Sequence, residues 1–186
     1  HADNRASRDR GRWVPIRPGT DGAMAMAIIR WLFDNERIDR RFLANPNAKV
    51  ASDYNEPSFS NATHLVIVEP GHPREGRMLR ASDIGIAIPA EQRYKDSDAF
   101  VCCDASGQLI AHDRATQPAE LFVERNVEID GRSIRVKSSL QLLREEATSL
   151  DLGAYSTACG IPTATLAGLA QELASHGKRA SVITHG

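Results

Sequence analysis

The sequence predicts a mixed α/β fold, made of Rossmann-like strand–helix elements with an antiparallel hairpin insertion. Apolar residues at 13–16 are separated by a turn from a long apolar run at 23–33, which predicts a strand followed by a helix. Near the other end, residues 163–175 have helical apolar periodicity and lead into a partly β-branched stretch at 179–184. A helix that feeds a buried strand is typical of doubly wound α/β folds. Between these parts, short alternating segments flank tight turns and predict hairpins.

The junction at residues 17–21 is the part of the chain most suited to touch a cofactor. N–H groups at a helix start have no partner within the helix and favour anionic or acceptor groups. Gly19 lets a ligand approach the main chain, and the carboxylate of Asp21 can accept two parallel hydrogen bonds, each worth roughly 1.5–3 kcal/mol when desolvated. The alternative is purely structural. In that case Thr20 or Asp21 is an N-cap worth about 1 kcal/mol, and Arg17 is a solvated charge.

The next part of the chain reads as short elements joined by loops. Residues 39–43 predict a short helix, and residues 46–61 are rich in Asn, Ser and Pro and predict a surface loop. A buried strand is predicted at 65–68, followed by a turn-dense loop at 69–76. The pattern of residues 77–88 predicts no particular structure.

Two hairpins are predicted in the middle of the chain. Residues 100–103 and 108–111 flank a short polar turn. Residues 127–129 and 133–136 alternate apolar with polar side chains around an Asp-Gly pair, which is the strongest short-range hairpin signal. Such strands form an antiparallel, half-exposed sheet and not a central parallel one.

The last third of the chain is predicted to be helical. Three helices are expected, at 139–147, at 151–159 before Gly160, and at 163–175, and the predicted strand at 179–184 follows them. This pattern divides the chain into three segments: 1–97 with the strand–turn–helix, 98–137 with the hairpin insertion, and 138–186 with the helices that return to a core strand.

Composition excludes several function classes. The 186 residues carry a formal net charge of -1, so bulk charge gives no reason to expect nucleic acid as a partner. No stretch approaches the ~20 apolar residues of a membrane span. Of the three cysteines, Cys102 and Cys103 are predicted to be buried core thiols and Cys159 to end a helix in the core.

No catalytic or metal-ligating residue is predicted. His64 and His72 lie near one strand, but no carboxylate or cysteine joins them at ligand spacing. Surface or core histidines are therefore expected at both positions, and no Ser-His-Asp or Cys-His arrangement follows from the spacing of the remaining residues.

Residues 15–23, Pro-Ile-Arg-Pro-Gly-Thr-Asp-Gly-Ala, carry a family resemblance. They resemble the strand–turn–helix element with which molybdopterin oxidoreductases of the dimethyl sulfoxide reductase family bind one guanine of their bis-molybdopterin guanine dinucleotide cofactor. Four shorter phrases, which are similar to the tetrathionate reductase group of that family only as an ordered set, lie at 61–67, 142–147, 159–162 and 175–180.

The resemblance implies roles for individual residues. Asp21 is expected to receive the guanine N1–H and 2-amino groups. Arg17, Gly19 and Thr20 are expected to shape the turn and contact the nucleotide. His185 lies where the family's next cofactor loop would begin.

The resemblance also implies a parent protein. It is expected to be a molybdenum- or tungsten-dependent reductase of anaerobic respiration, on the periplasmic side of the membrane, which reduces tetrathionate to thiosulfate. These 186 residues are then an internal part of the subunit, inactive alone. A 4Fe-4S cluster and the metal ligand are expected outside them. The implied partners are the rest of the subunit, an iron–sulfur electron-transfer subunit, and a membrane anchor subunit.

Two alternatives remain open at this point. In the first, the parent is a thiosulfate, polysulfide or arsenic-oxyanion reductase of the same family. This alternative is open because no residue of the chain can be identified as facing the substrate. Outside the family, the chain is a non-catalytic α/β interaction module in which residues 17–21 only begin a helix.

Overall fold

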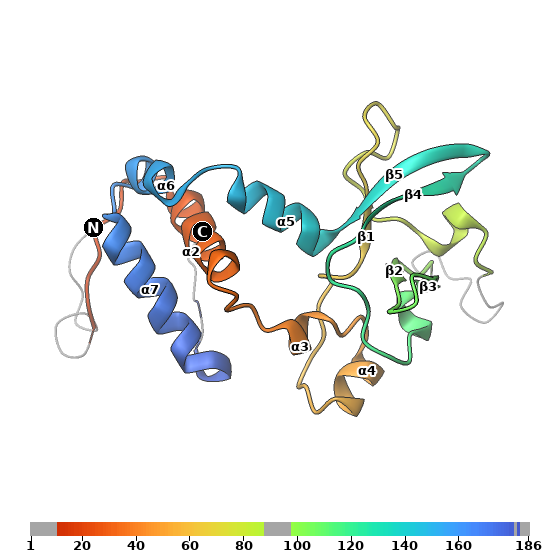
Figure 1. Cartoon of the computed structure of the whole chain (residues 1–186), viewed down its shortest axis with the longest axis horizontal. Helices are drawn as coiled ribbons and strands as arrows, with labels where there is room; N and C mark the ends of the chain where they lie inside the picture. The colour runs from red at the N-terminus through yellow and green to blue at the C-terminus, as the bar shows by residue number, and fades with distance from the viewer. Residues whose placement is uncertain (1–10, 88–97, 181, 183–186) are drawn as a thin grey trace. The chain divides into compact units, whose positions relative to one another are not determined.

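The computed structural model describes residues 11–87, 98–180 and 182, and Figure 1 shows its elements. Its described residues form two compact units. The helical unit runs up to Ile38 and resumes at Arg144, and the sheet unit comprises Asp39–Leu143. Helices and antiparallel strands both occur, which confirms the mixed α/β prediction. The segment boundaries predicted at 97 and 137 stay a prediction.

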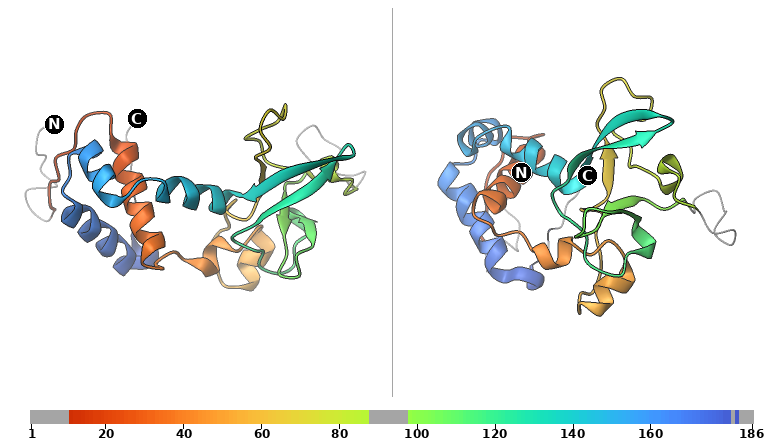
Figure 2. Two further views of the ribbon diagram at one scale, coloured as in Figure 1. Left: turned by 45° about the horizontal axis from the view of Figure 1, so that its top comes forward. Right: turned by 45° about the vertical axis from the view of Figure 1, so that its right-hand side comes forward.

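The helical unit is a group of packed helices. Its helices are α2 (Asp21–Asp34), α6 (Leu152–Cys159), α7 (Thr163–His176) and the short 3₁₀ helix η4 (Gly177–Arg179). Both views of Figure 2 show α2 in orange-red beside α6 and α7 in blue. Asp151 begins α6 by accepting a hydrogen bond from the Ala154 N–H at 2.7 Å, and left-handed Gly160 ends it. The helices predicted at 23–33, 151–159 and 163–175 are therefore confirmed.

The core of this unit forms between α2, α6 and α7. Ala27 of α2 is fully buried, as are Cys159 and Leu166, and Val14 and Ile16 pack against the same cluster. Burying such side chains contributes about 25 cal/mol per Å² of apolar surface removed from water. The predicted burial of Cys159 at a helix end is confirmed.

Residues 13–16 do not form the predicted strand. They are extended chain without a ladder, because the next N–H, that of Arg17, donates to the Cys159 carbonyl oxygen at a helix end and not to a neighbouring strand. At the other end, Arg179 lies in η4, and neither Ala180 nor Val182 is in a strand. The rest of the strand predicted at 179–184 lies outside the described residues.

The sheet unit contains two antiparallel sheets. The first has the strand order β1-β5-β4 and the second pairs β2 with β3. Their bounds are β1 (Leu65–Ile67), β2 (Val101–Cys103), β3 (Leu109–Ala111), β4 (Glu124–Ile129) and β5 (Arg132–Ser138). Both predicted hairpins are confirmed. In the β4–β5 turn Asp130 and Gly131 have φ values of 50° and 72°, the left-handed pair that a two-residue hairpin turn requires.

Alternation along β2 divides its two cysteines between two clusters. Cys103 belongs to the main core with Leu65 and Val136, whereas Cys102 faces a smaller cluster with Val50. Successive side chains of a strand point to opposite faces, so adjacent cysteines cannot share one site. The prediction that both are buried core thiols is confirmed.

The predicted loop at 46–61 contains a helix that the sequence analysis missed, α4 (Ala48–Asp53). Its cap, Asn47, accepts a hydrogen bond from the Val50 N–H at 2.8 Å and donates to the carbonyl oxygens of His112 and Ala115. These tertiary partners fix a helix that its own six residues would not hold.

The remaining helical elements include α5 (Ser139–Thr148), which confirms the helix predicted at 139–147. The helix predicted at 39–43 is α3 (Arg40–Leu43), which Asp39 caps. The others are the 3₁₀ helices η1 (Ala81–Ile84) and η3 (His112–Arg114). Within α5 the chain passes from the sheet unit to the helical unit. Within the described ranges, no helix has the length and apolar character needed to cross a membrane.

Candidate functional site

The turn ahead of α2 has a fixed backbone. The Thr20 N–H donates to the Arg17 carbonyl oxygen at 3.3 Å, and Gly19 between them has φ of 76°. Pro18 suits the second position of such a turn, and only glycine adopts the positive φ of its third position without strain. The sequence Arg-Pro-Gly-Thr therefore folds locally into a reversal that leads directly into the helix.

Arg17 ties this turn to the end of α6. Its guanidinium donates to the carbonyl oxygens of Thr157 at 3.2 Å and of Ala158 at 3.0 Å, and its N–H donates to that of Cys159 at 2.9 Å. These carbonyl groups belong to the negative end of a helix dipole, where a cation is favourable. The Arg17 side chain is exposed, but its guanidinium is hydrogen-bonded to α6. The alternative in which Arg17 is only a solvated charge is therefore wrong. In the sequence, Gly160 indicated where α6 ends. No pattern in the sequence indicated that Arg17 binds the carbonyl groups at that end.

Thr20 occupies the N-cap position of α2 without capping it through its side chain. Its hydroxyl donates to the Arg17 carbonyl oxygen at 2.6 Å, and among the described residues no side-chain oxygen caps the first turn of the helix. The alternative in which Thr20 or Asp21 is an N-cap is therefore right about the position of Thr20 and wrong about a side-chain cap, because the turn already uses the Thr20 hydroxyl and Asp21 is the first helical residue.

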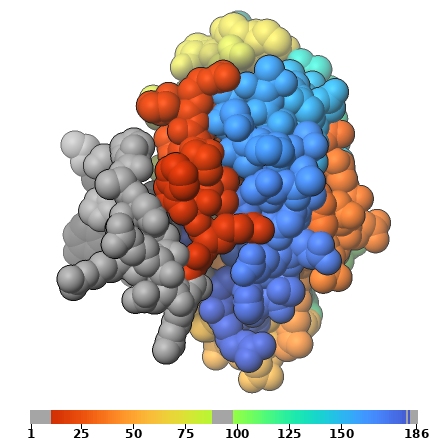
Figure 3. Space-filling view, turned by 90° about the vertical axis from the view of Figure 1, so that its left-hand side faces the viewer, coloured from red at the N-terminus to blue at the C-terminus, as the bar shows by residue number. Residues whose placement is uncertain are grey.

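The consequence is an open helix start with a carboxylate beside it. In the described part of the chain, the N–H groups of Asp21 and Gly22 have no hydrogen-bond partner and the Asp21 side chain is exposed without an ion pair. A Cβ added at Gly19 or Gly22 would meet nothing within 4 Å. Figure 3 shows the red segment around this turn at the surface, beside the blue helices. The surface can accept a flat hydrogen-bonding edge.

Other residues considered from the sequence lie elsewhere. His185 is outside the described residues. His72 accepts a hydrogen bond from the Arg74 N–H at 3.1 Å. His64 is buried, and within the described ranges its Nδ1 has no partner. The same ranges contain no group of three His, Cys, Asp or Glu side chains placed to hold a metal ion.

Burial sets the protonation of the two most perturbed groups in the sheet unit. It lowers the pKa of His64 to about 4, with a smaller contribution from the neighbouring His112. It raises the pKa of Cys102 to about 12, with further contributions from Cys103 and Asp104. Desolvation disfavours the charged form in both cases, so neither group is prepared for catalysis near neutral pH.

Comparison with known proteins identifies the family to which the chain belongs. No family model matches it. It is 38% identical over 178 residues to a tetrathionate reductase subunit of Salmonella typhimurium, 39% over 171 residues to a selenate reductase subunit of Mesobacillus selenatarsenatis, and 34% over 173 residues to a tetrathionate reductase subunit of Archaeoglobus fulgidus. These alignments cover 95%, 92% and 93% of the chain. The chain belongs to the dimethyl sulfoxide reductase family of molybdopterin oxidoreductases. It spans 17%, 15% and 14% of the length of these family members.

Membership of the dimethyl sulfoxide reductase family implies a molybdopterin cofactor, and the helix start of α2 fits part of such a group. Asp21 offers two acceptor oxygens, the first two N–H groups of α2 offer donors, and the glycines on either side leave room for a ligand. In a cofactor of this family, paired hydrogen-bond donors would match the Asp21 carboxylate, and anionic groups would match the first two N–H groups of α2.

Proposed function

We propose that this chain contributes a guanine-binding surface for bis-molybdopterin guanine dinucleotide in a molybdenum- or tungsten-dependent reductase. The observation that carries the proposal is the exposed carboxylate of Asp21 at the open start of α2, which has no ion pair with the described residues. Guanine presents its N1–H and 2-amino donors side by side. A carboxylate accepts two parallel N–H bonds of this kind, and being ionised it makes them shorter and stronger than neutral ones.

The neighbouring residues have separate roles in this proposal. Gly19 leaves the main chain open to the nucleotide, and the N–H groups of Asp21 and Gly22 donate to its acceptor atoms. Thr20 keeps hydroxyl lone pairs as acceptors. Arg17 is chiefly a positioning residue, because its guanidinium already binds two carbonyl oxygens of α6. His185 is proposed as a further contact of the following cofactor loop.

The activity of the whole protein is part of the proposal. The chemistry that the bound cofactor supplies is two-electron transfer at its metal, while residues of this chain bind and orient it. The proposed substrate is tetrathionate. Two electrons break its central S–S bond and give two thiosulfate ions. The electrons are proposed to arrive through a 4Fe-4S cluster outside this chain, from an iron–sulfur subunit, together with a membrane anchor subunit, on the periplasmic side.

Selenate reduction is the second candidate activity. The selenate reductase subunit is as similar to this chain, at 39% identity, as the Salmonella typhimurium tetrathionate reductase subunit, with 38%. The proposed guanine contact is the same for both substrates, so the choice between them rests on other parts of the protein. Reduction of thiosulfate, polysulfide or an arsenic oxyanion stays an alternative on the same ground.

The test replaces Asp21 in the whole protein, purified without oxygen. Asp21→Asn keeps the shape of the side chain but replaces one acceptor oxygen with a donor, and Asp21→Ala removes both oxygens. We expect both variants to contain several-fold less molybdenum or tungsten and less releasable guanine nucleotide after gel filtration, measured by mass spectrometry and chromatography.

The matched control is Glu172→Gln, which removes an exposed carboxylate from α7 in the same unit. This variant should keep the cofactor content of the unmodified protein. Unchanged cofactor content in both Asp21 variants would overturn the guanine contact, and absence of the cofactor from the unmodified protein would favour a non-catalytic interaction module. Oxidation of a reduced viologen dye by tetrathionate or by selenate separates the two activities.

A further inference from the structure

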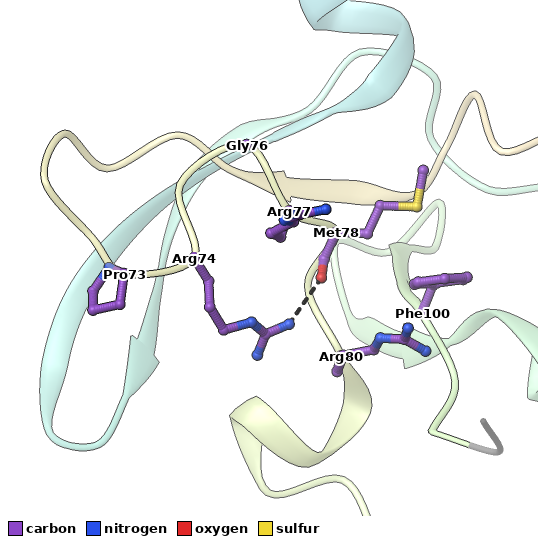
Figure 4. A pocket seen from close by; sticks show the side chains of 7 residues that line it. All are labelled: Pro73, Arg74, Gly76, Arg77, Met78, Arg80 and Phe100. Carbon is purple, nitrogen blue, oxygen red and sulfur yellow. Dashed lines mark hydrogen bonds between the residues drawn. The ribbon is translucent and has the colours of Figure 1, made fainter. Parts of the chain in front are cut away.

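An arginine-lined pocket lies in the sheet unit, and its lining includes no residue used in the proposed function. It has a volume of about 520 Å³ and is lined by side chains from the segment between Pro73 and Arg80 and by Phe100. Figure 4 shows Arg74 and Arg80 beside the cavity, with Arg77 on the turn above them. We call it the arginine pocket. Its volume lies within the roughly 300–1,000 Å³ typical of small-molecule sites.

The charge of the arginine pocket is not balanced. Among the described residues that line it, three are arginines and none is acidic. Arg74 forms an ion pair with Asp83, whereas Arg77 and Arg80 have no ion pair within the described ranges. Two positive charges are therefore available to a ligand.

Nearby carboxylates are engaged elsewhere. Asp98 accepts hydrogen bonds from the N–H and hydroxyl groups of Ser82, and Glu75 accepts from the Gly71 N–H at 2.9 Å. Asp83 accepts from the Arg80 N–H at 2.7 Å in addition to its ion pair with Arg74. These bonds hold the three carboxylates in place, and none of the three belongs to the residues that line the pocket in the described structure.

Arg80 is held in place before any ligand binds. Its guanidinium carbon lies 4.2 Å from the centroid of the Phe100 ring, a stacking distance at which the cation and the ring attract. One of its nitrogens donates to the Asp98 carbonyl oxygen. The remaining N–H groups of this fixed fork have no partner in the described part of the chain, and a pre-organised fork loses little entropy on binding.

Arg74 is also held in place by contacts within the sheet unit. Besides its ion pair, it donates to the Met78 carbonyl oxygen at 3.1 Å, the dashed line in Figure 4. The turn between them passes through Gly76, whose φ of 76° allows the chain to reverse. The reversal brings Arg74 and Arg80 to one cavity, with Arg77 exposed between them.

We propose that the arginine pocket binds a phosphate group, either as inorganic phosphate or as the phosphate monoester of a small organic molecule. Near neutral pH a phosphate monoester carries about -1.5 to -2 charge and three acceptor oxygens. This charge matches the two unpaired guanidinium groups, and guanidinium geometry favours paired bonds to phosphate oxygens. The volume exceeds that of one tetrahedral ion, and Phe100, Met78 and Pro73 offer apolar surface to an organic body.

The test measures binding of inorganic phosphate and of phenyl phosphate to the whole protein by calorimetry at low ionic strength. Arg77→Ala and Arg80→Ala should each weaken binding by about tenfold or more, the effect of losing charge-assisted hydrogen bonds. Arg77→Lys keeps the charge without the fork and should fall between. Tighter binding of phenyl phosphate than of phosphate identifies an organic monoester as the ligand, and equal binding identifies the free ion.

The control is Arg132→Ala, which removes an exposed arginine at the tip of the β4–β5 hairpin and should leave binding unchanged. Arg77 makes no side-chain hydrogen bond or ion pair within the described ranges, so its variant should keep the fold even if Arg80→Ala does not. Binding as tight in Arg77→Ala as in the unmodified protein would overturn the proposal. Equal weakening by Arg132→Ala, or no binding of either probe, would overturn it too.

Discussion

The guanidinium of Arg17 donates to the Ala158 carbonyl oxygen at 3.0 Å, so the turn ahead of α2 is attached to the last turn of α6. Residues 141 positions apart in the chain thus determine where Asp21 stands. The same contact satisfies carbonyl groups that the end of α6 leaves without partners inside the helix. Arg17, which is expected from the family resemblance to contact the nucleotide, therefore also has a structural role.

Replacing Arg17 should loosen the candidate site through α6. Arg17→Ala removes two hydrogen bonds to helix carbonyl groups and should lower the free energy of unfolding by about 1–2 kcal/mol. Arg17→Lys keeps the charge but not the fork and should lose less. Urea denaturation measures both. Arg12→Ala, which removes an exposed arginine nearby, should have no effect, and an Arg17→Ala variant as stable as the unmodified protein would contradict the contact.

The sheet unit should lose stability in mild acid because of His64. Burial, and second the nearby His112, lower the pKa of His64 from 6.5 to about 4. Between these values the unfolded chain binds a proton that the folded chain does not. Stability from this residue is therefore complete above about pH 6.5 and lost as the pH falls towards 4, by on the order of 3 kcal/mol. Urea denaturation from pH 4.5 to 7.5 measures the loss.

Two variants isolate this contribution. His64→Phe removes the titrating group but keeps an aromatic ring beside Phe100, so the decline with acid should become shallower. His176→Gln replaces an exposed histidine at the end of α7 and should keep the full decline. An identical pH profile for His64→Phe and the unmodified protein would mean that His64 is not held neutral.

The cap of α4 should be worth more than an exposed cap. Asn47 is buried and makes three hydrogen bonds through its side chain. Asn47→Ala removes two hydrogen bonds to carbonyl groups and one from the Val50 N–H, and should cost about 2–4 kcal/mol. Asp151→Ala removes only the exposed cap of α6 and should cost about 1 kcal/mol. Equal losses in thermal or urea unfolding would refute the difference.

The β4–β5 turn should tolerate little change at its glycine. Gly131 has a φ of 72°, which a residue with a Cβ adopts only at a cost of about 1 kcal/mol. Gly131→Ala should destabilise the hairpin by that amount, whereas Asp130→Asn, with φ of 50° at its position, should be neutral. Hydrogen exchange of the β4 and β5 amides measures both, and faster exchange in Asp130→Asn would be unexpected.

Local patterns predicted the elements that local interactions hold. The Asp130-Gly131 pair fixed the register of β4 against β5, with Val127 opposite Ile134. Gly160 fixed the end of α6. In both cases the backbone conformation depends on residues within a few positions, so the sequence contains the whole signal.

Tertiary contacts decided the rest. Residues 13–16 have strand composition, but the described structure offers them a helix end and not a strand edge. Residues 48–53 form a helix because Asn47 reaches carbonyl groups more than sixty positions away. The arginine spacing at 74, 77 and 80 became a pocket only through a turn and the distant Phe100. The family resemblance and the carboxylate of Asp21 are properties of the sequence itself. The openness of that carboxylate is not, because whether a polar group has a partner depends on which distant segments fold beside it.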